Sequence, residues 1–437
     1  MSGTSGRPFG PGTLAALVVA NMIGAGVFTT SGFTLADLGS PGRVLAAWAV
    51  GGVIAVCGAV GYGALARRLT ESGGEYLFLA RVLHPAAGFV AGWISLLAGF
   101  TGAIAFAAHA FESYVRPADS AVPPNLIAVA AILVATAVHA VRARFGAFGQ
   151  NGIVVVKLVV LAVFVGLAGA RWAGAAPDWP TCTPQEFSLA AFAGALVWIS
   201  LSYSGFNAAV YVAGEARDPA RTVPAAMLRA TIAVTLVYLA LNLVFVGFVP
   251  CADVQGRPDV AVAAASSLLG DAGARLVRAV VALALLSSVS SMIMAGPRVF
   301  ARMADDGVFP AALRFRGETP AAAIAVQAAL AIVLVLVSDL RSLLGYLGLT
   351  LSLSAALTVS CVFVLRRRHG TAAVPVTGSV VLPGIYVVAT VTLAVLAAGR
   401  QPQEWLAAGV TVASGLIAWR LIGRRGTSRG RGPNGLP

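Results

Sequence analysis

Two short polar stretches interrupt long apolar runs of this chain, and both could expose backbone groups for binding. The first is Gly24-Ala25-Gly26, and the second is centred on Gly205 within Trp198-Ile-Ser-Leu-Ser-Tyr-Ser-Gly-Phe-Asn207. A glycine pair in an apolar helix can be a packing seam, or it can be an unwound point whose amides line a polar cavity. Because an interruption occurs in each half of the chain, we expect helix breaks at Gly24, Gly26 and Gly205.

A broken helix presents two opposite partial charges to a ligand. The N-terminus of the second half-helix offers unpaired N–H groups to an anion, while the C-terminus of the first offers carbonyl oxygens to a cation. A zwitterion such as an amino acid fits both ends at once. The two stretches therefore indicate a binding site for a small zwitterion.

Lys157 is the only lysine of the chain, and it lies inside an apolar run at residues 150–170. A charge at that depth is costly and by default suggests a function. The alternative is snorkelling to the membrane interface, because Asn151 opens the run only a short distance before it. A buried lysine changes its pKa readily, so Lys157 could also couple a proton to the cycle.

The other polar candidates carry weaker signals. His109 and Glu112 share a helical face and could gate or carry a proton, although a solvated helix end is the simpler interpretation. The charges within residues 215–221 could latch a gate or form a solvated loop. Three side chains near the second interruption could close over a ligand, although aromatic rings also fill ordinary helix packing: Trp198, Tyr203 and Asn207.

The composition places these residues in a membrane. Of 437 residues, 58% are hydrophobic and only 11% are charged, against about 25% charged in soluble domains. A span needs about 20 apolar residues, and the chain offers twelve such runs. They are 12–35, 42–66, 86–113, 124–141, 150–170, 187–213, 223–249, 276–303, 320–338, 342–365, 374–398 and 404–423.

Basic residues set the expected orientation. With the N-terminus inside, 21 of the 30 Lys and Arg residues fall in inner segments and 8 in outer ones, which predicts that both termini are cytoplasmic. The basic tail at 424–437 then faces anionic lipid rather than nucleic acid. Cys182 and Cys251 fall in different outer loops, so a disulfide is possible, but the sequence alone does not establish one.

Three motifs resemble the amino acid–polyamine–organocation superfamily. The first is Asn21-Met-Ile-Gly-Ala-Gly-Val-Phe28. The second is Tyr203-Ser-Gly-Phe-Asn-Ala-Ala, followed by Gly214-Glu-Ala-Arg-Asp-Pro-Ala-Arg-Thr-Val-Pro224. The third is Ala295-Gly-Pro-Arg-Val-Phe-Ala-Arg-Met-Ala-Asp-Asp-Gly-Val-Phe-Pro310. The resemblance covers essentially the whole chain. It implies an all-α polytopic protein with a LeuT-like five-plus-five inverted repeat, in which helices 1 and 6 are discontinuous. The implied segments are 1–11 (tail), 12–171 and 187–365 (repeats), 374–423 (two added spans) and 424–437 (basic tail).

The resemblance also implies how a substrate binds. Its carboxylate would lie on the amides of Ala25, Gly26 and Val27, although many relatives have a hydroxyl residue where this chain has Ala25. Its amino group would meet four backbone carbonyls, those of Met22, Leu201, Ser202 and Ser204. Lys157 would occupy the place where sodium-coupled relatives bind their ion, bonded to a carbonyl near Gly24 and to hydroxyls among Ser287, Ser288, Ser290 and Ser291.

These inferences predict a secondary transporter of neutral L-amino acids in a plasma membrane, such as a bacterial inner membrane, working by alternating access. Neutral substrates are favoured because no acidic residue occupies the break in span six. Coupling would be sodium-independent, by proton symport or exchange, with no cofactor, metal, ATP or nucleic acid. The alternatives are a sodium symporter, a transport-inactive sensor, and a membrane-embedded enzyme, for which the four histidines are too scattered.

Overall fold

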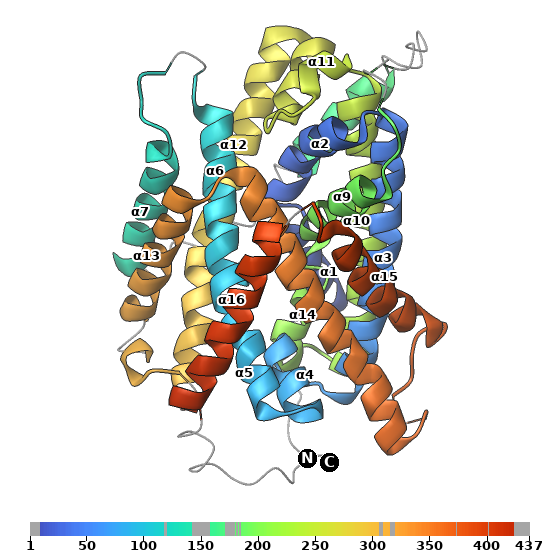
Figure 1. Ribbon diagram of the computed structural model, residues 1–437, viewed down its shortest axis with the longest axis vertical. Coiled ribbons are helices and arrows are strands. Elements are labelled where there is room, and N and C mark those ends of the chain that lie inside the picture. Colours follow the sequence, from blue (N-terminus) through green and yellow to red (C-terminus); the bar gives the residue numbers. More distant parts are fainter. Residues whose placement is uncertain are drawn as a thin grey trace.

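A computed structural model describes residues 9–117, 120–141, 158–170, 180, 182, 185–305, 309–314, 320–372, 374–400 and 402–423. Most of the described chain is helical (Figure 1). An isolated β-bridge in the described part places Phe9 beside Ala216. Lys157 lies outside the described residues, and so do residues 150–156 of the predicted run 150–170.

Seven helices of the described residues are long and apolar enough to cross a membrane. They are Pro41–Arg68, Pro85–Val115, Leu189–Glu215, Pro219–Gly247, Val260–Ala301, Leu340–His369 and Pro402–Ile422. Four shorter apolar helices accompany them, at Leu126–His139, Leu158–Ala170, Ala321–Val337 and Val381–Ala397. Many large apolar side chains point outward, among them Leu406, which is 70% exposed. An outer surface of this kind suits hydrocarbon rather than water.

The first apolar run is two helices rather than one. Helix α1 (Pro11–Met22) and helix α2 (Ala25–Leu38) are bent by 41° across Ile23 and Gly24. The Gly24 amide donates to the Met22 carbonyl over 2.8 Å, which turns the chain too tightly for a helix to continue. Two half-helix ends therefore meet in the middle of an apolar run.

The sixth apolar run is also interrupted. Helix α9 (Leu189–Tyr203) ends before Gly205, whose φ of +97° lies in the region that favours glycine. The chain resumes as the short 3₁₀ helix η2 (Ala208–Glu215). A four-residue turn thus separates two helical pieces that the hydropathy pattern alone would merge.

The remaining elements surround these two interruptions. Helices α3 (Pro41–Arg68) and α10 (Pro219–Gly247) pack along each other, and α10 also packs on α1. Helix α14 (Leu340–His369) packs on α9. The third run comprises α5 (Pro85–Ile94), a π-helical turn η1 (Ser95–Gly102) and α6 (Ala103–Val115). Short helix α4 (Gly74–Val82) precedes it.

The other helices lie around this centre. They are α7 (Leu126–Val141), α11 (Cys251–Val254), α12 (Val260–Asp305), the 3₁₀ turn η3 (Ala311–Leu313), α13 (Ala321–Val337), α15 (Val381–Ala397), α16 (Pro402–Ala418) and the π-helical turn η4 (Trp419–Gly423). Helix α11 lies at one end of the molecule, and α4 and α5 lie at the other (Figure 1).

Two predicted boundaries were wrong. The run 276–303 belongs to α12, which starts at Val260 and bends at Gly270, where φ is +68°. Its first ten residues are apolar but too short to span. The run 374–398 becomes helical only at Val381, because Arg67 binds the Pro375 carbonyl and the Thr377 hydroxyl and holds the preceding segment as a turn.

Candidate functional site

The two interruptions touch each other through their glycines. A Cβ placed on Gly26 would lie 2.8 Å from the Cα of Ser202, and one placed on Gly205 would lie 2.9 Å from the backbone carbonyl of Asn21. Both distances are shorter than any real Cβ contact. The two breaks can therefore adjoin only because these positions lack side chains.

Tyr238 joins the two broken helices through a single hydroxyl. It comes from α10, is fully buried, and lies 2.5 Å from the Met22 carbonyl oxygen and 2.9 Å from that of Ser202. One hydroxyl carries one proton, so it can donate to only one of these carbonyls at a time. Both carbonyls are among those expected to receive a substrate amino group. Sequence reasoning missed Tyr238, although a lone tyrosine in the apolar α10 run was a usable signal.

Aromatic rings support this hydroxyl. The rings of Trp48 and Tyr203 lie 5.2 Å from that of Tyr238, measured between centroids. Tyr203 donates its own hydroxyl to the Trp48 carbonyl over 3.0 Å. Tyr203, expected to be a gate, is therefore part of the packing that fixes Tyr238.

The first turn of α2 lies at the same place. Ala25, Gly26 and Val27 are buried, and Gly24 provides no side-chain cap. The N–H groups of a first helical turn have no carbonyl partner within the helix, so they can receive an anion. The Thr30 hydroxyl lies 3.3 Å from that of Ser202 beside this turn.

A third carbonyl expected at the site, that of Leu201, is engaged by neighbouring groups of its own chain segment. It accepts the amide and the hydroxyl of Ser204, over 3.0 and 2.6 Å, so it closes the end of α9. The contacts centre on Met22 and Ser202.

The serines expected to meet Lys157 lie on α12 and bond within it or to a neighbour. Ser288 donates to the Ala284 carbonyl, and Ser291 donates to that of Ser287. Ser290 lies 2.7 Å from the Nε2 atom of His139 on α7. Since Lys157 is outside the described residues, its contact with these serines stays a prediction.

Trp198 lies in the second half of α9, beside a cluster of charges. The guanidinium of Arg341 lies 4.8 Å from the centre of its ring and also binds the carboxylate of Asp37 at the end of α2. Arg400 lies 3.7 Å from the same carboxylate. These contacts join α2 to the start of α14, at the opposite side of the break from η2.

Asn207 lies on the other side of the second interruption and binds a carboxylate. Its amide donates to Glu75 of α4 over 3.2 Å. The sequence of span six contains no acidic residue at the break, as expected. The structure nevertheless places an acidic residue of another element, Glu75 of α4, beside the second interruption.

Glu112 is not a solvated side chain, so that interpretation was wrong. It is buried, and its carboxylate accepts the amides of Asn125 and Ala128 over 2.9 and 3.0 Å. These amides begin α7, so Glu112 caps that helix and complements its positive end. A cavity of about 300 Å³ beside it is lined in part by His109.

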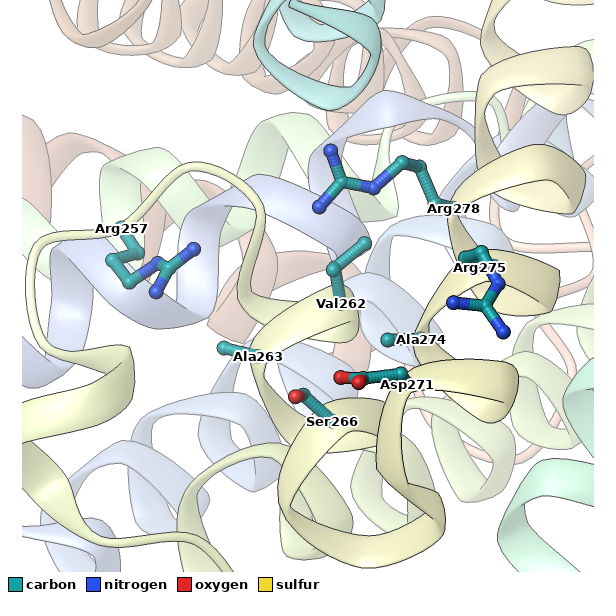
Figure 2. A pocket seen from close by; sticks show the side chains of 8 residues that line it. All are labelled: Arg257, Val262, Ala263, Ser266, Asp271, Ala274, Arg275 and Arg278. Atoms are coloured by element: carbon teal, nitrogen blue, oxygen red, sulfur yellow. The ribbon is translucent and has the colours of Figure 1, made fainter. Parts of the chain in front are cut away.

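A larger cavity of about 460 Å³ lies near the bend of α12. Figure 2 shows Arg257, Arg275, Arg278 and Asp271 around it. Arg257 also forms a two-point ion pair with Asp259. Neither cavity includes a residue of the two breaks.

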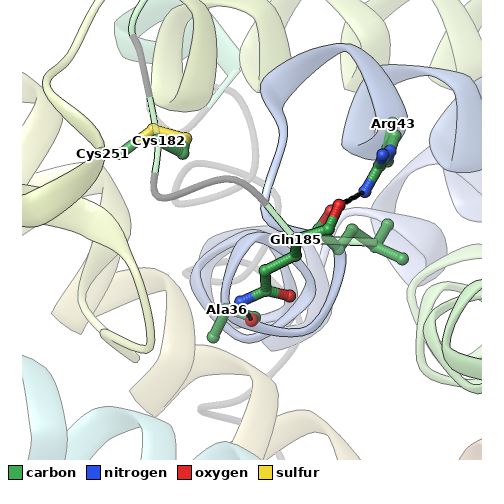
Figure 3. Close-up of a disulfide and its surroundings, with 6 residues drawn as sticks. Ala36, Arg43, Cys182, Gln185 and Cys251 are labelled. Atoms are coloured by element: carbon green, nitrogen blue, oxygen red, sulfur yellow. Dashed lines mark hydrogen bonds between the residues drawn. A yellow bond between two sulfur atoms is a disulfide. The ribbon is translucent and has the colours of Figure 1, made fainter. Parts of the chain in front are cut away.

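Cys182 and Cys251 form a disulfide, with their Cα atoms 5.3 Å apart (Figure 3). Gln185, which follows Cys182 closely in the chain, contacts the end of α2. Gln185 donates its side-chain amide to the Ala36 carbonyl over 3.2 Å and accepts Arg43 at its own carbonyl over 2.8 Å.

Comparisons with known proteins agree on one group. The family described as "Amino acid permease" matches residues 9–417. The chain is similar to "b(0,+)-type amino acid transporter 1" of Mus musculus, with 26% identity over 93% of this chain and 86% of that protein. It is also similar to "Large neutral amino acids transporter small subunit 2" of Rattus norvegicus, with 28% identity over 88% of this chain and 75% of that protein.

Proposed function

The chain belongs to the amino acid permease family, and we propose that it carries neutral L-amino acids across the plasma membrane by alternating access. The observation that carries this proposal is the Tyr238 hydroxyl, which touches the Met22 and Ser202 carbonyls beside the uncapped first turn of α2. Carbonyls and free amides side by side match the two charges of an amino acid.

The preference for neutral substrates rests on the polar groups at the breaks. They are neutral backbone groups and hydroxyls, such as those of Ser202 and Thr30. The acidic group at the edge of the second interruption, that of Glu75, already accepts hydrogen bonds from Tyr62, Asn207 and Ser354. A cationic side chain would therefore have to displace these donors.

The proposed mechanism has a substrate site with two exits that open in turn. Segments 12–171 and 187–365 would be the inverted repeats, and their broken spans would rock against the rest. Coupling would be sodium-independent, by proton symport or exchange, with Lys157 in the position of the sodium ion.

Both termini would face the cytoplasm. Cys251 of the disulfide begins α11. Helix α11 lies opposite the end that bears α4 and α5 (Figure 1). Disulfides persist in oxidising surroundings and are rare in the cytosol, which supports an outward-facing α11. The excess of Arg at the other end supports the same orientation.

Uptake of a panel of radiolabelled amino acids into proteoliposomes tests the proposal. We expect saturable uptake of neutral L-amino acids and no response to sodium. Each amino acid is also tested for exchange by preloading the liposomes with the unlabelled compound. Failure of every amino acid in both assays would contradict the function, whereas strong sodium stimulation would contradict only the coupling.

A further inference from the structure

Glu75 is a buried carboxylate outside the proposed substrate site. Glu75 lies at the start of α4 and is only 6% exposed. Oxygen Oε1 accepts the Tyr62 hydroxyl and the Asn207 amide, and Oε2 accepts the Ser354 hydroxyl over 2.9 Å. All three donors are neutral.

No ion pair among the described residues includes Glu75. Two charged side chains that contact this region bind other groups: Arg81 pairs with Glu71 at the surface, and Arg368 binds the Val82 carbonyl at the far end of the helix. The titratable groups that interact with Glu75 are three tyrosines from the elements packed around it: Tyr62, Tyr211 and Tyr386.

An ionised carboxylate without a cation is costly to bury and is usually neutralised instead. Burial raises the pKa of Glu75 above its ordinary value, and the hydrogen bonds from Tyr62 and Ser354 offset only part of this rise. The surroundings thus favour the protonated side chain over the ionised one.

The partners of Glu75 come from three separate parts of the chain. Tyr62 belongs to α3, Asn207 lies directly after the second interruption, and Ser354 belongs to α14. An opening between the two breaks and this end of the molecule would have to separate them. Water would then reach Glu75.

We propose that Glu75 is a proton-binding site of the transport cycle, which holds a proton while the inner end is closed and releases it to the cytoplasm when that end opens. This inference rests on the proposed function, and it identifies Glu75 as the residue that binds the coupled proton. On opening, the O–H bond of Glu75 breaks, the proton passes to cytoplasmic water, and a solvated carboxylate remains.

The direction of the pH effect follows from linkage. The pKa of Glu75 is higher in the closed state than in the solvated open state, so proton binding favours closure. Acidification should stabilise the closed inner end as the pH falls through the raised pKa. The effect is complete near the ordinary value of 4.5.

A cysteine at Ala208 reports opening without any substrate. Ala208 is 7% exposed and follows Asn207, and the buried thiols of Cys57 and Cys361 are first replaced by alanine. Inside-out vesicles are treated with an impermeant thiol reagent between pH 8 and pH 5. Acid slows the reaction of any thiol, because the thiolate is the reacting form. Each rate is therefore divided by that of a cysteine at the exposed Ala372, measured at the same pH. We expect this labelling ratio to fall at least about fivefold with acid, since this pH span covers a one-proton step.

Glu75→Gln mimics the protonated side chain, so its labelling ratio should be low and independent of pH. Glu71→Gln removes a carboxylate from the same segment, 60% exposed and paired to Arg81, and it should follow the parent. Ser354→Ala removes a donor that stabilises the ionised form of Glu75, so the midpoint of the pH response should move to higher pH. This variant tests the proposal even if Glu75→Gln does not fold.

A labelling ratio of the parent that does not change with pH, or an unchanged pH response of that ratio in Glu75→Gln, would overturn the proposal. An unmoved midpoint in Ser354→Ala would do the same. Because labelling needs no substrate, a chain that carried no amino acid could still show the pH effect. Uptake and labelling thus distinguish failure of the function from failure of the proton site.

Discussion

At the scale of single residues, two glycines bring two polar backbones together inside an apolar protein. Gly26→Ala should impair transport, because the new methyl group would lie 2.8 Å from the Cα of Ser202 and force α2 away from α9. Overpacking of this kind costs about 1–3 kcal/mol. Gly26→Val adds further bulk and should abolish substrate binding while the protein still reaches the membrane.

The measurement is uptake per folded protein, with Gly409→Ala as the control. Gly409 lies in α16, where an added Cβ meets nothing within 4 Å. Normal transport by Gly26→Val would mean that the glycines form only a packing seam.

Tyr238→Phe should lower transport about tenfold, because a buried carbonyl that loses its donor costs about 1–3 kcal/mol. The ring would remain, so packing against Trp48 and Tyr203 should survive. Tyr346→Phe is the matched control, since its hydroxyl lies 2.8 Å from that of Thr411, between α14 and α16. Equal rates for the two variants would remove Tyr238 from the mechanism.

The sequence identified the residues at the breaks but not their partners. Glycine and serine residues stand out in an apolar run of the sequence, and their presence there indicates an interrupted helix. Tyr238 and Glu75 act through contacts with residues far away in the chain, and a single sequence holds no record of such contacts. Glu112 was misjudged for the same reason, since its partners begin the next helix.

At the scale of elements, the end of α2 is joined to α14 by the Asp37–Arg341 ion pair. Asp37 is 13% exposed, and Arg341 also stacks on Trp198. A half-buried pair with a cation–π contact is worth about 1–2 kcal/mol. Arg341→Gln should therefore favour the outward-open state.

A cysteine at the fully buried Thr34 of α2 measures this opening. With Cys57 and Cys361 replaced, its labelling from outside intact cells should rise about fivefold in Arg341→Gln. Arg275→Gln, which removes a charge from α12 instead, should leave the rate unchanged. A rate that is equal in both variants would show that the pair does not hold the outer end.

Most helices could be predicted from hydropathy, because a run of about 20 apolar residues has few other uses. The errors came where local contacts override composition. Arg67 holds residues 375–377 as a turn before α15. Gly270 bends α12, so that a short apolar segment precedes the long part of this helix. Hydropathy averages over such contacts and does not detect them.

At the scale of the whole molecule, coupling can be tested at the only lysine. Lys157→Met keeps the length of the side chain and removes its charge. We expect net uptake to collapse, because the charge would tie span five to the first break. Sodium should affect neither protein, since the ammonium would repel the ion from this place.

Rising uptake at acidic external pH, measured in proteoliposomes, would indicate proton symport by the parent. A variant with the parent's rate and pH response would reduce Lys157 to a snorkelling side chain.

The orientation predicts that both ends of the chain are cytoplasmic. Cysteines placed at residues 3 and 430 should resist an impermeant reagent applied to intact cells and react after permeabilisation. Efficient labelling of either from outside would reverse the topology.

The bond between Cys182 and Cys251 has a topological result for the chain. The two residues are 69 positions apart, and α9 and α10 both lie between them, so these helices belong to a covalent ring. A protease that cuts between η2 and α10 would open the ring without releasing a fragment. The nicked protein should run as one band on a gel without reductant and as two bands with it.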